Sequence, residues 1–250
     1  MNNEDILIEF INSSYNKFSS YINYNSNLIY NKYYKNILQL ISGNKNTILN
    51  SKDTLTRNLE FENLFKDINS NIDNLGKELL EIINNKLSNL YYDIFNKVIN
   101  IYSFNNNISN IDIYNENWSG ILFKDRILFN MEKLKFSLKD IIYKEINKKS
   151  SNKIIGNTII KTILSSNKAY IRLANNEAVY LQNKAIFNAC SINYIEKIKI
   201  TAILDNKTCK DCNDKNGNIT DINTMQKGID MPPFHVGCRC YLIPFISISI

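Results

Sequence analysis

Two short stretches near the C-terminus carry most of the information about the fold: Cys209-Lys-Asp-Cys212 and, after 22 intervening residues, His235-Val-Gly-Cys238-Arg-Cys240. Two cysteines separated by two residues lie on one tight turn, so both thiolates can face a single cation. A second pair of ligands on a distant turn closes a tetrahedral site, and thiolate with imidazole suits Zn²⁺. The spacing therefore predicts a zinc site that uses four of five residues: Cys209, Cys212, His235, Cys238 and Cys240.

The spacing leaves the fourth ligand open. His235 and Cys238 are the natural second pair, but in an extended chain Cys238 and Cys240 point to the same face, and either can complete the site. Two other interpretations also stay open. The cysteines can form two disulfides, which a reducing cytosol disfavours and a particle outside the cell permits, or they can be small buried hydrophobes. Cys190, in a predicted alanine-bearing helix, is expected in the core.

Around these stretches the sequence predicts a mainly α protein with a small α+β domain at the C-terminus, in which short strands surround a Cys/His-clasped loop. Strands are expected at 197–204 and 241–245. Upstream, apolar residues recur at helical spacing without proline, which predicts long helices with Asn3 as the first N-cap. Helix breaks are expected near 42–44 and 148–152, and two separate helices over 155–164 and 168–191.

Charge divides the chain near residue 115. Residues 1–115 carry 10 basic and 12 acidic side chains, whereas 116–250 carry 20 and 12, together with all five cysteines. We expect a helical arm at 1–115, with a polar connection at 103–117, then a basic helical region at 116–193 and the Cys/His-containing segment at 194–250. The 43 Asn and 42 Ile indicate an A/T-rich coding genome. No apolar stretch approaches ~18 residues and the start lacks a basic region, so neither a membrane span nor a secretory signal is expected.

Lysine is concentrated in the middle of the chain, with nine Lys against two acids between positions 133 and 168. Such residues usually keep a helix face soluble. They can also contact phosphates without sequence preference, and the scarcity of arginine argues against specific base recognition. The candidates for non-specific contact with double-stranded DNA are Lys133, Lys135, Lys139, Lys144, Lys148 and Lys149.

An enzyme is not expected, and no catalytic residue is assigned. A metal nuclease needs a further histidine as base or ligand, and the chain has only His235. A zinc-dependent nucleic-acid-processing enzyme, nuclease-like, is the alternative function. A toxin delivery domain is a third possibility, but it needs a catalytic domain after the cysteines, and the sequence ends ten residues after Cys240.

The runs Ile-Leu-Asp-Asn-Lys-Thr-Cys-Lys-Asp-Cys from Ile203 and Pro-Pro-Phe-His-Val-Gly-Cys-Arg-Cys from Pro232 resemble the phage Mu F-like head morphogenesis family. Trp118-Ser119-Gly120 resembles an upstream motif, so the resemblance covers about 116–245. Asn183 matches a family Asn, whereas Ala174-Asn175-Asn176-Glu177 replaces an Arg-Thr-Glu helix and keeps only its Glu. The residues expected to have structural roles in the motif are Trp118, Glu177, Asp205, Thr208, Gly217 and Arg239.

This resemblance implies a structural minor head protein of a tailed phage. Its expected partners are the portal protein, the major capsid or scaffold protein, and double-stranded DNA, and its implied roles are head morphogenesis and DNA packaging or ejection. The expected location is the virion, in the interior of the head or procapsid, and the host cytoplasm during assembly. In such a domain the zinc cluster stabilises a loop that core burial alone cannot hold, and Arg239 is expected to hydrogen-bond Asp205.

Overall fold

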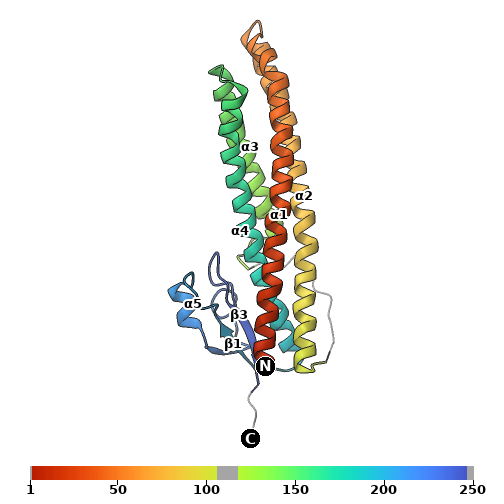
Figure 1. Ribbon diagram of the computed structural model, residues 1–250, viewed down its shortest axis with the longest axis vertical. Coiled ribbons are helices and arrows are strands. Elements are labelled where there is room, and N and C mark those ends of the chain that lie inside the picture. Colours follow the sequence, from red (N-terminus) through yellow and green to blue (C-terminus); the bar gives the residue numbers. More distant parts are fainter. Residues whose placement is uncertain (1, 106–117, 247–250) are drawn as a thin grey trace. The chain divides into compact units, whose positions relative to one another are not determined.

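The computed structural model describes residues 2–105 and 118–246, in which four long helices precede a small sheet (Figure 1). The helices are α1 (Asn3–Leu49), α2 (Thr54–Tyr102), α3 (Phe123–Asn147) and α4 (Asn152–Ile192). The elements that follow are β1 (Lys197–Thr201), α5 (Lys210–Lys215), β2 (Ile219–Asp221) and β3 (Tyr241–Phe245). The predicted fold class is therefore confirmed. Most of the connection expected at 103–117 lies outside the described residues.

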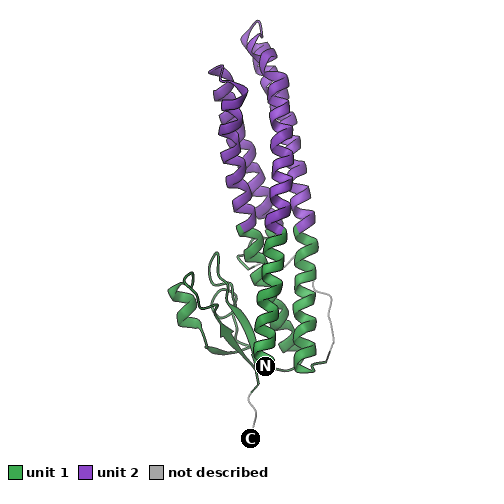
Figure 2. Ribbon diagram, viewed as in Figure 1, with its two compact units in different colours: residues 1–21, 83–123, 172–250 green, residues 22–82, 124–171 purple. Residues whose placement is uncertain are grey.

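The chain packs as two compact units, each built from segments that are far apart in the sequence (Figure 2). Unit 1 comprises residues 1–21, 83–123 and 172–250, and unit 2 comprises residues 22–82 and 124–171. These units cut across the three contiguous regions expected from charge and cysteine content, because α1, α2 and α4 each contribute to both. The three-region division describes composition and stays a prediction.

Unit 2 consists of parts of α1, α2 and α4 together with α3, and its core is a layered set of apolar side chains. Ile41, Leu64, Leu138 and Ile163, one from each helix, are at most 3 % exposed. Polar bonds link the same helices. Tyr30 on α1 bonds the Ser166 hydroxyl on α4 at 3.1 Å. The connection predicted near 148–152 is confirmed, since α3 ends at Asn147 and α4 begins at Asn152.

Two predicted helix breaks are wrong. Gly43 lies inside α1, because isoleucines on either side keep the buried stripe continuous and a single helical glycine costs only about 1 kcal/mol. The expected gap between residues 164 and 168 lies inside α4. There Ser166 and Asn167 are buried and bonded to α1, Asn167 to Asn27 at 2.7 Å, so these polar residues form a polar layer of the bundle.

The first helix begins one residue earlier than predicted. The side chain of Asn2, not Asn3, accepts the Asp5 backbone N–H at 2.8 Å and so caps α1. Asp53 caps α2 in the same way, accepting from the Thr56 backbone N–H at 2.8 Å and from its hydroxyl at 2.9 Å. Both caps satisfy N–H groups that have no partner within their own helix.

Unit 1 contains the three-stranded sheet, whose order is β2-β1-β3 with both pairings antiparallel. In β1, Ile198 and Ile200 alternate with more exposed residues, as expected for a strand with one face on the core. β3 coincides with the predicted strand at 241–245, whereas β1 stops at Thr201 instead of Leu204 because the chain turns there toward Asp205. α5 and β2 were not predicted.

Candidate metal centre

The first two cysteines lie at the start of α5, where a tight turn brings them together. Cys209 is the N-cap residue of this helix, and its sulfur accepts the backbone N–H of Cys212 at 3.4 Å. An N–H donor favours the thiolate over the thiol. This hydrogen bond is the main reason why the pKa of Cys209 is lowered.

The turn before Cys209 is fixed by the predicted motif residues. Thr208 accepts the Asp205 backbone N–H at 2.8 Å and donates its hydroxyl to the Ile203 carbonyl at 2.5 Å. The Asp205 carboxylate accepts the Lys207 backbone N–H at 2.9 Å. After α5, Gly217 has a φ of +83°, a conformation that strains residues with a Cβ, and donates its N–H to the Ile200 carbonyl at 2.8 Å.

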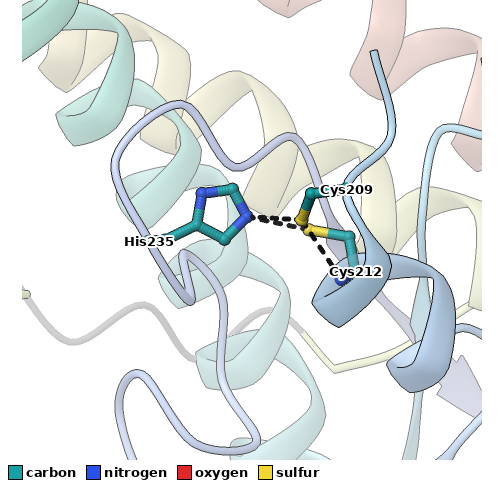
Figure 3. A group of neighbouring side chains, drawn as sticks. All are labelled: Cys209, Cys212 and His235. Atoms are coloured by element: carbon teal, nitrogen blue, oxygen red, sulfur yellow. Dashed lines mark hydrogen bonds between the residues drawn. The ribbon is translucent and has the colours of Figure 1, made fainter. Parts of the chain in front are cut away.

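His235 lies opposite this turn and points its Nε2 at both sulfurs (Figure 3). The distances from Nε2 to Cys209 Sγ and to Cys212 Sγ are both 3.1 Å. Its Nδ1 is 3.0 Å from the Val236 carbonyl, which can only accept, so Nδ1 carries the proton and the lone pair of the neutral ring is on Nε2. Burial lowers the pKa of His235, but the bond to the Val236 carbonyl and the nearby thiolates outweigh burial, and the pKa is raised.

Cys238 and Cys240 complete the cluster on its buried side. Cys212 Sγ lies 3.8 Å from Cys238 Sγ, and the Cys240 backbone N–H points at Cys238 Sγ at 3.5 Å. Hydrogen bonding from the Cys240 thiol is the largest contribution that lowers the pKa of Cys238 to about 5. Burial raises the pKa of Cys212 to about 12, and the pKa of Cys240 is raised mainly because its proton is shared with Cys238.

The five predicted ligands therefore form two overlapping groups that share Cys212. Cys209, Cys212 and His235 form one, and Cys212, Cys238 and Cys240 form the other, with the ligand atoms of each group within 4.8 Å of one another. All five cysteines are free thiols, and Cys190 is fully buried in α4 as predicted. The alternative of small buried hydrophobes is also partly realised, because three of these cysteines pack with Ala202 and Phe234 in a small core: Cys212, Cys238 and Cys240.

The thiolate and imidazole donors fit a cation that is bound with tetrahedral geometry. Zn–S bonds of about 2.3 Å place two sulfurs about 3.8 Å apart, and a Zn–N bond of about 2.0–2.1 Å places nitrogen and sulfur about 3.6 Å apart. The separation between Cys212 and Cys238 matches, while His235 lies closer to its two sulfurs than this geometry requires. A thiol must lose its proton to become a ligand, so binding releases protons from this cluster.

An ion pair joins the two turns that carry the ligands. Arg239, between Cys238 and Cys240, donates from Nη1 to Asp205 Oδ2 at 2.7 Å and from Nη2 to Asp205 Oδ1 at 2.5 Å. The predicted contact is thus present in bidentate form, which is the stronger geometry for this pair. Hydrogen bonding from the Arg239 guanidinium is the largest contribution that holds the pKa of the Asp205 carboxyl well below its usual range.

The loop is also attached to α4 by two asparagines. Asn176 Oδ1 accepts the Gly237 backbone N–H at 2.8 Å. Asn183, which is fully buried, accepts the Leu242 N–H at 2.7 Å and donates to the Cys240 carbonyl at 3.0 Å. No role was predicted from the sequence for either residue: Asn176 stands in the segment that departs from the family motif, and Asn183 only matches a family Asn. Trp118 and Glu177, two other motif residues, are joined by a 3.2 Å bond from the indole N–H.

The lysines predicted to contact DNA lie elsewhere, on α3 and the turn after it, in unit 2. Three of the six are engaged with acids. Lys135 pairs with Asp73 and Glu132, each at 2.6 Å. Lys144 pairs with Asp140 at 2.8 Å and Lys148 with Glu145 at 3.1 Å. Lys139 lies over the Phe65 ring, while Lys133 and Lys149 are exposed.

The fold and the cluster define a class of protein: long helices followed by a small antiparallel sheet that carries a Cys/His cluster. Within this class, residues 137–243 match the sequence model of the family described as Phage Mu protein F like protein. The predicted family is therefore confirmed over this region, which contains all five candidate ligands, and the match supports a role in phage head morphogenesis. The resemblance upstream of residue 137 stays a prediction. No curated protein and no solved structure matches the chain. Among the described helices, none is both long and apolar enough to cross a membrane.

The Asp205–Arg239 pair gives the first testable prediction. The folded-state pKa of Asp205 is below its unfolded value of about 3.9, so the pair stabilises the fold above about pH 4 and this contribution is lost as pH falls further. We expect the difference in unfolding free energy between wild type and Asp205→Asn to be constant from about pH 7 to 5 and to shrink between about pH 4 and 2. Urea unfolding at each pH measures it. In an Arg239→Ala background the difference should be small at every pH, and an equal difference at pH 6 and pH 3 in the wild-type background contradicts the prediction.

Proposed function

We propose that this chain is a structural minor head protein of a tailed phage, associated with the portal protein, and that it acts in head assembly and DNA packaging or ejection. The match of residues 137–243 to a Mu F-like family carries this proposal. The cluster supports a structural role over catalysis. His235 already faces two sulfurs, and no other histidine exists in the sequence to act as a base. Long helices offer extended surfaces to the portal and to capsid or scaffold proteins.

The location of the protein in particles tests this function directly. We expect quantitative mass spectrometry of purified phage particles and of DNA-free procapsids to find the chain in both, at a copy number far below that of the major capsid protein. Cross-linking within these particles should join it to the portal. Particles that lack the chain, with normal assembly after deletion of its gene, would contradict the proposal.

We further propose that the cluster binds one zinc ion through Cys209, Cys212, His235 and Cys238. Cys238 is preferred over Cys240 as the fourth ligand because its sulfur lies 3.8 Å from Cys212 Sγ, the separation that a shared ion requires. The ion then joins the α5 turn to the loop before β3. It supplies charge and geometry for folding and no redox chemistry.

Metal analysis of freshly reduced protein measures this site. We expect about one equivalent of zinc in the wild type and in Cys190→Ala, and little in Cys209→Ser or Cys238→Ser. Cys240→Ser should retain the metal if Cys238 is the fourth ligand. Less than about half an equivalent in the wild type argues against a closed structural site, and loss of zinc only in Cys240→Ser would reassign the fourth ligand.

A contact with packaged DNA is the last part of the proposal. Unit 2 has 18 basic and 11 acidic residues, a net charge of +7, whereas unit 1 has 12 and 13, a net charge of −1. The positive charge of the chain is therefore concentrated in unit 2, which contains the candidate lysines. Since three of these lysines are already paired with acids, we expect weak, non-specific binding.

Gel retardation of a double-stranded fragment at different salt concentrations measures this contact. We expect retardation at low salt that weakens steeply as salt rises, because binding to phosphates releases counterions. Lys133→Glu with Lys149→Glu, both exposed in unit 2, should weaken binding and flatten the salt dependence. Lys17→Glu with Lys197→Glu changes the same charge at exposed sites in unit 1 and should leave binding nearly unchanged. Equal losses for both pairs, or no binding at low salt, would remove the DNA contact from the proposal.

A further inference from the structure

We propose that Asn176 and Asn183 are positioning residues for the metal centre, and that α4 sets the geometry of the loop that supplies its ligands. This inference rests on the proposed zinc site. It assigns a function to two buried carboxamides that are not ligands themselves. The observation that carries it is the position of their hydrogen bonds, which fall on both sides of Cys238.

The first bond holds the loop just before Cys238. Gly237 has a φ of +82°, a left-handed conformation that glycine adopts without strain. Its N–H donates to Asn176 Oδ1 at 2.8 Å. Asn176 is only 5 % exposed whereas Gly237 is exposed, so this bond is partly buried. The residue between His235 and Cys238 that reverses the chain is thus attached to a helix.

The second attachment follows Cys238. Asn183 presents both ends of its carboxamide to the backbone, accepting from the Leu242 N–H and donating to the Cys240 carbonyl. This is the pattern by which a neighbouring strand would pair with an edge strand, and β3 is an edge strand of the sheet. Asn183 therefore fixes the register of the chain that enters β3. The side chain donates as well to the Val179 carbonyl of its own helix at 2.8 Å, which holds its orientation.

The two asparagines are seven residues apart on α4, about two helical turns, and so lie on the same face of one rigid element about 10 Å apart. A pair of fixed points at this spacing holds the loop on each side of Cys238 and limits where its sulfur can lie relative to Cys212. Outer hydrogen-bonding partners of this kind change metal affinity by about 10–100-fold when they are removed.

Matched alanine variants on the same helix test the inference. Asn188, also on α4, donates to the Tyr91 hydroxyl at 2.9 Å, and Gln182, 3 % exposed, donates to the Ile11 carbonyl at 3.3 Å. Neither of these bonds reaches the loop. Asn188→Ala is therefore the control for loss of an asparagine, and Gln182→Ala is the control for loss of a buried carboxamide.

The probe is Co²⁺ alone, titrated into the reduced full-length protein and followed by its visible absorption, with circular dichroism to confirm that each variant is folded. We expect wild type, Asn188→Ala and Gln182→Ala to bind Co²⁺ with similar dissociation constants and tetrahedral spectra. In Asn183→Ala the dissociation constant should rise by about 10–100-fold with an altered spectrum. Asn176→Ala, which loses one bond instead of two to the loop, should show a smaller rise and keeps the test decisive if Asn183→Ala does not fold.

The outcomes separate the two proposals. If the wild type binds no Co²⁺, both the proposed metal site and this inference are contradicted. If the wild type binds Co²⁺ and the loop variants bind it as the controls do, the inference alone is overturned and the zinc site stands. If Gln182→Ala loses as much affinity as Asn183→Ala, the asparagines act only through general stability, which also overturns it.

Discussion

The packing of the small domain at the C-terminus depends on cysteine side chains. One buried cluster around the ligands consists of Ala202, Cys212, Cys238 and Cys240, with Phe234 packed against them, so three of its four buried residues are cysteines. Such a core removes little apolar surface from water, about the amount of two or three large side chains, and cannot by itself offset the entropy of ordering a loop of more than twenty residues. Other contacts must therefore hold the segment between Cys209 and Cys240. Buried Ile222 and Met231 contribute, together with the hydrogen bonds, the ion pair and the proposed cation.

These contacts act on different parts of the same loop. The Asp205–Arg239 pair joins the turn before α5 to the loop before β3 from the solvent side, where it is screened and contributes modestly. Asn176 and Asn183 attach the loop to α4. The bonds of Asn183 are buried, and leaving the Cys240 carbonyl or the Leu242 N–H without a partner costs about 1–3 kcal/mol. A cation bound to Cys212 would connect both groups of ligands. In this arrangement the sheet, the helix and the metal ligands support one another within unit 1.

Much of this domain could be predicted because its candidate ligands are residue types that are rare in the chain. In a chain with one histidine and five cysteines, the spacing of Cys209, Cys212, His235 and Cys238 was informative, and the structure brings all of them together. The contact between Arg239 and Asp205 followed from a charged pair flanking the same ligands. By contrast, Asn176 and Asn183 are two of 43 asparagines, and residue type alone does not separate a buried carboxamide that pairs with a strand from one that faces solvent. Their function depends on the distant backbone that they contact.

The helix errors have a related physical cause. Ser166 and Asn167 lie in the expected gap between two helices, and their short polar side chains can compete for backbone hydrogen bonds. Inside unit 2 their partners are Tyr30 and Asn27 on α1, so the polar groups are satisfied by another helix and α4 continues. The same reasoning applies to charge. Local sequence indicates a basic stretch on α3, but Lys135 finds Asp73 on α2, more than sixty residues earlier in the chain. A local pattern of polarity or charge therefore indicates function only after its partners across the bundle are known, which is why the DNA contact is expected to be weak and the metal centre, whose ligands face one another, is the stronger candidate.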